Sequence, residues 1–137
     1  MSTAPVFLLV EPYPTFRLRL QIWLEQVLVH PTILTATNGM EALRLTEQEQ
    51  PSHILIEMEL PDMPGLEVLR QIRQILPDAR IVATGWHESR FIINEVQSAG
   101  ANGFIRKPKL PNGLPDLWEI PPESKMDNGK TSTRPDH

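Results

Sequence analysis

The sequence predicts a doubly wound α/β fold, in which a five-stranded parallel sheet is covered by helices on both faces. Short apolar runs rich in branched residues alternate along the chain with longer segments whose apolar residues recur at helical spacing. Proline, glycine or charged residues follow each run, which indicates short strands buried on both faces. Right-handed crossovers between parallel strands then favour the sheet order 2-1-3-4-5, with the strands numbered along the chain.

The first strand is predicted at 5–10, a mostly apolar run that ends at Glu11. A helix is predicted over 16–29, with Thr15 as its N-cap and one apolar face. That face consists of Phe16, Leu20, Trp23, Leu24 and Val27. Arg17 is expected on the opposite, solvated face of the same helix.

The second strand is predicted at 32–36 and the second helix at 40–48, after an Asn-Gly turn signal. Met40 and Leu43 are expected to face the core. The third strand is the short apolar run 54–56, which stops at two acids followed by prolines and a glycine. The inward face of the third helix consists of Leu66, Leu69, Ile72, Ile75 and Leu76.

The fourth strand is predicted at 80–84 and the fourth helix at 88–99, with Gly100 as its C-cap. The inward face of this helix is expected to hold Phe91, Ile92, Val96 and Ala99. A short fifth strand follows at 103–105.

Prolines and a glycine punctuate the chain after Leu110 and exclude a full fifth helix directly after the fifth strand. Leu117 and Trp118 are expected to cover the sheet face in its place. The final stretch has too few large apolar residues to offset the entropy of ordering it. We therefore expect a domain at 1–120 and a disordered tail at 121–137.

Composition places the chain among ordinary soluble proteins, with 137 residues, 40% hydrophobic and 22% charged. The net charge of -4 disfavours nucleic acid as a direct partner, because phosphate-binding faces need a basic surplus. Cysteine is absent, and no stretch resembles a signal peptide or a membrane span. We expect a cytoplasmic protein with no membrane partner.

Polar side chains follow four of the predicted strands. Glu11 follows the first, Glu57 and Glu59 the third, Thr84 ends the fourth, and Lys107 follows the fifth. The carboxyl ends of parallel strands meet at one edge of a sheet, where ligands bind. Carboxylates are ligands for Mg²⁺, while hydroxyl and ammonium groups hold phosphoryl oxygens, so this set is typical of a phosphoryl and Mg²⁺ site.

The chain resembles the receiver domains of response regulators, the CheY-like family with a flavodoxin-like fold. The resemblance extends over 6–108 and rests on four motifs in the family's order. These are FLLVEP at 7–12, ILIEMELPDMPGLE at 54–67, IVATG at 81–85 and GANGFIRKP at 100–108.

The resemblance implies a role for each matching residue. In the family an aspartate at the end of the third strand takes a phosphoryl group from a histidine kinase, and an acid pair after the first strand holds Mg²⁺. Carried over, Thr84 is the hydroxyl and Lys107 the ammonium that contact the phosphoryl group. Phe104 is the aromatic residue that moves on activation, and the backbone carbonyl of Glu59 matches a metal contact.

Two positions depart from the family pattern. Glu57 stands at the acceptor aspartate, and Glu11-Pro12 stands where two acids are usual. Glutamate places its carboxylate about 1.5 Å further out, and a misplacement of about 1 Å can slow a reaction roughly 10²-fold. Because Mg²⁺ can be held by one or two carboxylates plus waters, weak binding by Glu11, Glu57 and Glu59 stays open.

These departures predict a pseudo-receiver, a two-component signalling module that is not phosphorylated in the ordinary way and is not an enzyme. Its partner would be a sensor kinase or a downstream signalling protein, and it would be a monomer or weak dimer. Glu57 either mimics the activated state or simply neutralises Lys107. The alternatives are a working Mg²⁺-dependent acceptor at Glu57, and a small-molecule binder or enzyme on a flavodoxin-like scaffold.

Overall fold

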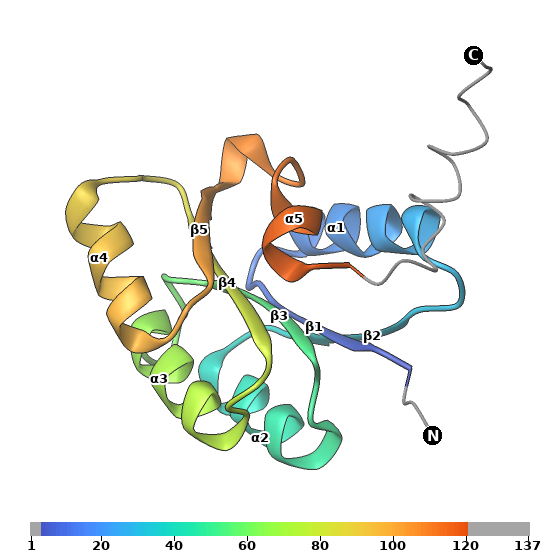
Figure 1. The fold of residues 1–137 in the computed structure, drawn as a ribbon, viewed down its shortest axis with the longest axis horizontal. Helices are drawn as coiled ribbons and strands as arrows, with labels where there is room; N and C mark the ends of the chain where they lie inside the picture. Colours follow the sequence, from blue (N-terminus) through green and yellow to red (C-terminus); the bar gives the residue numbers. More distant parts are fainter. Residues whose placement is uncertain (1–3, 121–137) are drawn as a thin grey trace.

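The computed structural model describes residues 4–120, which form one parallel sheet in the order β2-β1-β3-β4-β5 (Figure 1). The strands are β1 (Val6–Val10), β2 (Thr32–Ala36), β3 (His53–Glu57), β4 (Arg80–Gly85) and β5 (Gly103–Arg106). The helices are α1 (Pro14–Val27), α2 (Gly39–Glu49), α3 (Gly65–Ile75), α4 (Arg90–Ala99) and α5 (Leu114–Trp118), with the 3-10 turn η1 (Lys107–Lys109). The predicted fold and strand order are confirmed. The tail predicted at 121–137 lies outside the described residues.

Helices cover the sheet on both faces (Figure 1). The helices α2, α3 and α4 lie on one face, and α1 and α5 lie on the other. Each face has its own hydrophobic core, with Ile54, Ile56 and Ile72 in one and Phe7, Leu55 and Trp118 in the other. The alternation of β3 side chains between these cores explains why the strand is apolar throughout.

Parallel pairing brings the carboxyl ends of the strands together. Val10 pairs with Ile56, and Glu57 pairs with Thr84 across β3 and β4. The residue after β1 is held in line with the sheet, because Glu11 N donates to Ala36 O over 2.9 Å. Residues that follow β1, β3 and β5 therefore meet at one edge.

Helix α1 begins one residue before the predicted N-cap. Its first residue is Pro14 and its N-cap is Tyr13, so the prediction of Thr15 as N-cap was wrong. Proline at the first helical position starts the helix because its φ angle is already fixed there. Arg17 is half-buried instead of solvated, because its Nη1 donates to the carbonyl oxygens of Glu11 and Pro12 over 2.8 and 3.4 Å.

Two predicted inward residues point to solvent. Met40 is 72% exposed and Phe91 is 70% exposed. In α4 the buried side chains Val96 and Ala99 continue the row of Ile92, at i, i+4 and i+7, so Phe91 lies one position outside it. In α2 the buried row begins at Gly39, so Met40 is likewise one step of about 100° away.

Helix α5 is short but tightly attached to the sheet. Trp118 is fully buried, and its Nε1–H donates to Ile54 O over 3.0 Å. Arg80 donates to Leu117 O from both Nε and Nη2, over 3.1 and 2.8 Å. The expectation that Leu117 and Trp118 cover the sheet in place of a full helix is confirmed.

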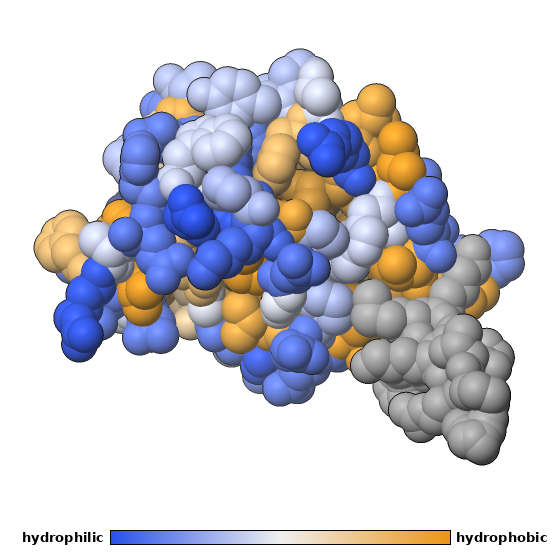
Figure 2. All heavy atoms as spheres, turned by 90° about the horizontal axis from the view of Figure 1, so that it is seen from above, coloured by the Kyte–Doolittle hydropathy of each residue, from blue (hydrophilic) through white to orange (hydrophobic). Residues whose placement is uncertain are grey.

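Several large hydrophobic side chains remain on the surface. Tyr13, Leu18, Ile22 and Trp86 are among those exposed by more than two fifths. On the face shown in Figure 2, hydrophobic patches alternate with polar side chains. Within the described residues no helix is long and apolar enough to cross a membrane.

Candidate functional site: a buried ion-pair cluster

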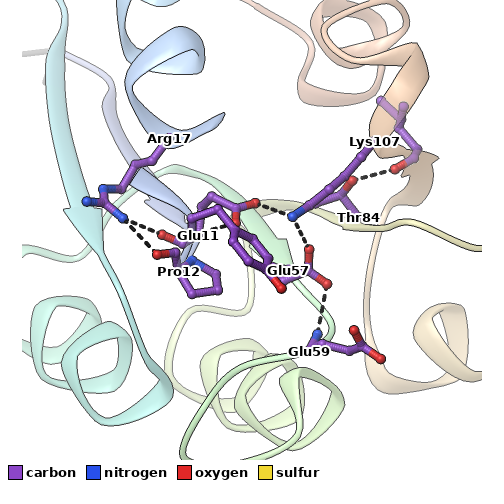
Figure 3. A network of polar contacts seen from close by, with 9 residues as sticks. Glu11, Pro12, Arg17, Glu57, Glu59, Thr84 and Lys107 are labelled. Carbon is purple, nitrogen blue, oxygen red and sulfur yellow. Dashed lines mark hydrogen bonds and ion pairs between the residues drawn. The ribbon is translucent and has the colours of Figure 1, made fainter. Parts of the chain in front are cut away.

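Lys107 reaches across the carboxyl edge of the sheet to both acids (Figure 3). Its Nζ lies 2.8 Å from Glu11 Oε1 and 2.5 Å from Glu57 Oε1. All three side chains are at most 3% exposed. These short contacts join groups of opposite charge and are ion pairs.

The second oxygen of each carboxylate is bound to the backbone. Glu11 Oε2 accepts from Tyr13 N over 3.0 Å, and Glu57 Oε2 accepts from Glu59 N over 2.8 Å. Both bonds span two residues, so each acid is fixed by the turn that follows its own strand. The two carboxylates are therefore held on opposite sides of one ammonium group.

Three aromatic rings cover the ammonium group. Lys107 Nζ lies 4.7 Å from the ring centroid of Tyr13, 4.9 Å from that of Phe16 and 5.3 Å from that of Trp86. The rings of Phe16 and Trp86 also contact each other, with centroids 6.4 Å apart. Aromatic faces attract cations and exclude water, so this aromatic cap stabilises the charged form of Lys107.

The pKa values reflect burial and pairing together. Burial by itself lowers the pKa of Lys107, but its contacts with Glu11 and Glu57 outweigh that effect and raise the pKa above its usual value. Burial raises the pKa of Glu11 above its usual value, although Lys107 and the Tyr13 N–H oppose the shift. Two carboxylates share one ammonium, so the cluster has an excess negative charge when all three groups are ionised.

The structure leaves Thr84 and Glu59 outside this ion-paired cluster. Thr84 Oγ1 donates to Ile105 O over 2.6 Å, so the hydroxyl bonds to the backbone of β5. Glu59 is exposed and contributes its backbone N–H to Glu57. Phe104 is partly buried and lines a hollow beside Glu57.

Residues 7–118 match the family described as "Response regulator receiver domain". The chain belongs to this family. The match begins at the second residue of β1 and covers the other four strands in full.

Curated relatives agree with this assignment. The chain is 34% identical over 104 residues to the transcriptional activator protein ExaE of Pseudomonas putida, covering 76% of this chain and 49% of that one. It is 31% identical over 77 residues to the chemotaxis protein CheY of Thermotoga maritima, covering 56% of this chain and 64% of that one. The chain thus spans about half to two thirds of the length of these relatives.

Solved structures share the fold. A CheY-like receiver domain protein from Methanospirillum hungatei has a TM-score of 0.77 at 22% identity, covering 95% of this chain and 99% of that one. A response regulator from Burkholderia pseudomallei, described with a phosphorylated aspartic acid, calcium ion and citrate, has a TM-score of 0.77 at 21% identity. That match covers 95% of this chain and 73% of the other.

The carboxylates of this receiver do not fit the Mg²⁺ that the family resemblance implies. The space between Glu11 and Glu57, where a metal would bridge the two acids, is taken by the Lys107 ammonium. Pro12 supplies no carboxylate, and the described residues contain no group of three potential metal-ligating side chains. A dication at this point would meet the ammonium charge at close range without gaining a third acid.

Sequence reasoning missed the part that Tyr13 and Phe16 play in the aromatic cap. Tyr13 and Phe16 come from the start of α1, and Trp86 comes from the loop after β4. Phe16 looked like an ordinary core residue because it shares the helical spacing of the α1 apolar face. The only available signal was that all three aromatics lie within a few residues of predicted strand ends.

Proposed function

We propose that this receiver regulates through protein contacts and does not take a phosphoryl group at Glu57 in the ordinary Mg²⁺-dependent manner. The observation that carries the proposal is the pair of contacts from Lys107 to Glu11 and Glu57. The lysine that would hold a phosphoryl group already has two negative partners, and the acids that would hold the metal are both engaged. Phosphorylation would have to break a buried cluster before any chemistry began.

The extra methylene of Glu57 supports the same conclusion. It moves the carboxylate about 1.5 Å beyond the position of an aspartate, which is enough to disturb a reacting geometry. In this site the longer side chain reaches Lys107 directly, and the contact is fully buried. Glu57 thus neutralises Lys107, the second of the two roles that the sequence left open.

The pairing also limits how far Glu57 imitates a phosphorylated acceptor. A phosphoryl group brings about −1.5 to −2 charges and three acceptor oxygens, whereas Glu57 brings one charge that Lys107 already balances. A charge-assisted hydrogen bond contributes about 1.5–3 kcal/mol, while moving a switch between its extremes needs about 5.5 kcal/mol. The paired charge of Glu57 is therefore too small to lock the domain in an active-like state.

The partner in this proposal is a protein, either a sensor kinase or a downstream signalling protein. ExaE of Pseudomonas putida, described as a transcriptional activator protein, is about twice as long as the part that this chain matches. The receiver is proposed to be non-enzymatic.

Restoring the family's acids at positions 12 and 57 tests the proposal. The double variant Pro12→Asp with Glu57→Asp recreates the family's acid set, and we expect it to take a phosphoryl group from phosphoramidate when Mg²⁺ is present. The matched control is Pro12→Asp with Glu57→Asn, which has the same metal acid but no acceptor carboxylate. The proposal fails if the double variant and the unaltered chain are labelled at the same rate.

A further inference from the structure

A hollow of about 300 Å³ opens beside the buried cluster, and its lining includes Glu57, Glu59, Gly85, Trp86, Ile92 and Phe104. It lies where the ends of β3 and β4 meet the start of α4 and the strand β5. Pockets that enclose small molecules begin at about this volume. The hollow is therefore large enough for a compact ligand with one ring.

Gly85 opens the floor of this hollow to a carboxylate oxygen. A Cβ atom at residue 85 would lie 3.7 Å from Glu57 Oε2 and 3.7 Å from Phe104 Cζ. Because glycine has no side chain, the buried oxygen and the edge of the ring both face the open space. Glu57 Oε2 accepts one hydrogen bond, from Glu59 N, and a carboxylate oxygen can accept a second.

The charge at the floor and rim of the hollow is negative. The cluster beneath it holds two carboxylates against one ammonium. Glu59 at the rim is exposed, and within residues 4–120 its carboxylate has no ion-pair partner. A cation entering the hollow meets Glu57 Oε2 below and Glu59 beside it.

The walls combine apolar and aromatic side chains with two polar ones, His87 and Ser89. Trp86 stands on one side, and Phe104 lines the hollow together with Ile92. Carboxylates attract an organic ammonium ion, while aromatic side chains pack against the apolar part of the same molecule. A strongly hydrated metal ion would lose water to apolar walls without compensation.

We propose that this hollow binds a small organic cation, an ammonium group carried on a short aromatic or aliphatic chain. The ammonium donates to Glu57 Oε2 and pairs with Glu59, and its apolar part lies between Trp86 and Phe104. The proposal rests on the proposed function, since the crevice accepts a ligand only where phosphoryl chemistry has been given up. Trp86 also covers Lys107, so occupancy of the hollow is transmitted to the aromatic cap.

The test is a titration with phenethylammonium chloride, followed by the three indole N–H signals in ¹H–¹⁵N NMR spectra at constant ionic strength. The neutral analogue 2-phenylethanol has nearly the same shape and serves as the ligand control. We expect the Trp86 signal to shift and saturate, while Trp23 and Trp118 stay in place. The alcohol is expected to bind up to about fivefold more weakly, the effect of losing one exposed ion pair.

Variants of the lining residues locate the site. Gly85→Ala adds a methyl group that fits at ordinary contact distance, so the fold is retained while the carboxylate oxygen is covered, and we expect at least about tenfold weaker binding. Glu59→Gln is expected to weaken binding about threefold. Glu88→Gln, in the same loop but outside this hollow, is the matched control and should bind as the unaltered chain does.

Equal shifts with the alcohol, an unchanged affinity in Gly85→Ala, or parallel shifts of Trp23 and Trp118 would each overturn this site. An equal shift of the Trp86 signal with MgCl₂ would show that the hollow binds a metal ion and not specifically an organic cation. Phosphorylation of the unaltered chain, measured separately, would contradict the proposed function. Failure of the amine to bind would contradict only this inference.

Discussion

Lys107 is a buried cation whose charge is balanced from two sides. Removing one partner of a buried ion pair is much more costly than forming the pair is favourable, because the remaining charge stays desolvated. The two carboxylates share the single ammonium group of Lys107, so each acid competes for its partner whereas the lysine does not. The loss of an acid and the loss of the lysine should therefore have unequal effects on stability.

We predict that Lys107→Met lowers the free energy of unfolding by about 3–5 kcal/mol, because it leaves two carboxylates buried without a counter-charge. Glu11→Gln should cost about 1 kcal/mol or less, because Glu57 still pairs with the lysine and the excess negative charge is removed. Urea denaturation of both variants measures the difference. Equal losses would show that the excess charge is unimportant.

His53 gives the stability a dependence on pH near neutrality. Its ring is buried, stacks on Phe7 with centroids 4.8 Å apart, and its Nδ1 lies 2.8 Å from Ser52 Oγ. Burial lowers the pKa of His53 below its usual value of 6.5, and the charge of Arg80 lowers it further. The folded state thus binds the proton less tightly than the unfolded state does.

Stability from His53 is therefore present above pH 6.5 and is lost as the pH falls through 6.5 towards the folded-state pKa. We expect His53→Phe, which preserves the ring stacking, to flatten the stability profile in this window. Thermal melts of both proteins across the window supply the comparison. His87→Phe, at an exposed position, is the control and should keep the slope of the unaltered chain.

At the scale of elements, α5 replaces a long helix with a few strong contacts. The five residues of α5 are attached to the sheet by the indole hydrogen bond of Trp118 and by two hydrogen bonds from Arg80 to Leu117 O. Arg80 also forms an ion pair with Glu119, the residue after the helix, at 3.3 Å. The ion pair is partly exposed and contributes little. The buried ring of Trp118 is therefore the main anchor.

We expect Trp118→Ala to destabilise the fold by about 3–5 kcal/mol, because it empties a fully buried site beneath β1 and β3. Trp118→Phe should cost about 1–3 kcal/mol, mainly through the lost donor to Ile54 O. Urea denaturation measures both, with the exposed Leu18→Ala as a control expected to change little. A Trp118→Ala variant as stable as the control would mean that α5 is not anchored by this ring.

Sequence patterns predicted the order of the strands better than the orientation of the helices. Strand order and the meeting of Glu11, Glu57 and Lys107 followed from parallel topology, which places the carboxyl ends of strands at one edge. The predictions that Met40 and Phe91 face the core were wrong, because a shift of one residue along a helix turns a side chain by about 100°. The spacing of apolar residues near a helix end is too sparse to fix that phase.

Side-chain direction explains the remaining differences. Thr84 was placed at the correct strand end, but its hydroxyl turns to Ile105 O, a choice between rotamers that no sequence pattern records. The aromatic cap brings Tyr13 and Phe16 against Trp86 from a distant loop. Such contacts depend on how two loops fold over the sheet edge, and the sequence contains no periodic signal for them.

At the scale of the whole molecule, the short α5 bears on self-association. The fifth helix has five residues, of which Leu114 and Trp118 are buried, so it offers little surface for a second copy of the chain. We predict a monomer, or a weak dimer at high concentration, by sedimentation equilibrium. A tight dimer that dissociates on Phe91→Glu, at the exposed position of α4, would contradict this prediction.

The central claim concerns one cluster: an ammonium held between two glutamates in place of a metal and a phosphoryl group. Intact-mass measurement of the unaltered chain, after incubation with phosphoramidate and Mg²⁺, tests it most directly. The account predicts a mass that does not change under conditions that label the variant carrying both Pro12→Asp and Glu57→Asp. A phosphoryl adduct on the unaltered chain that maps to Glu57 would contradict it.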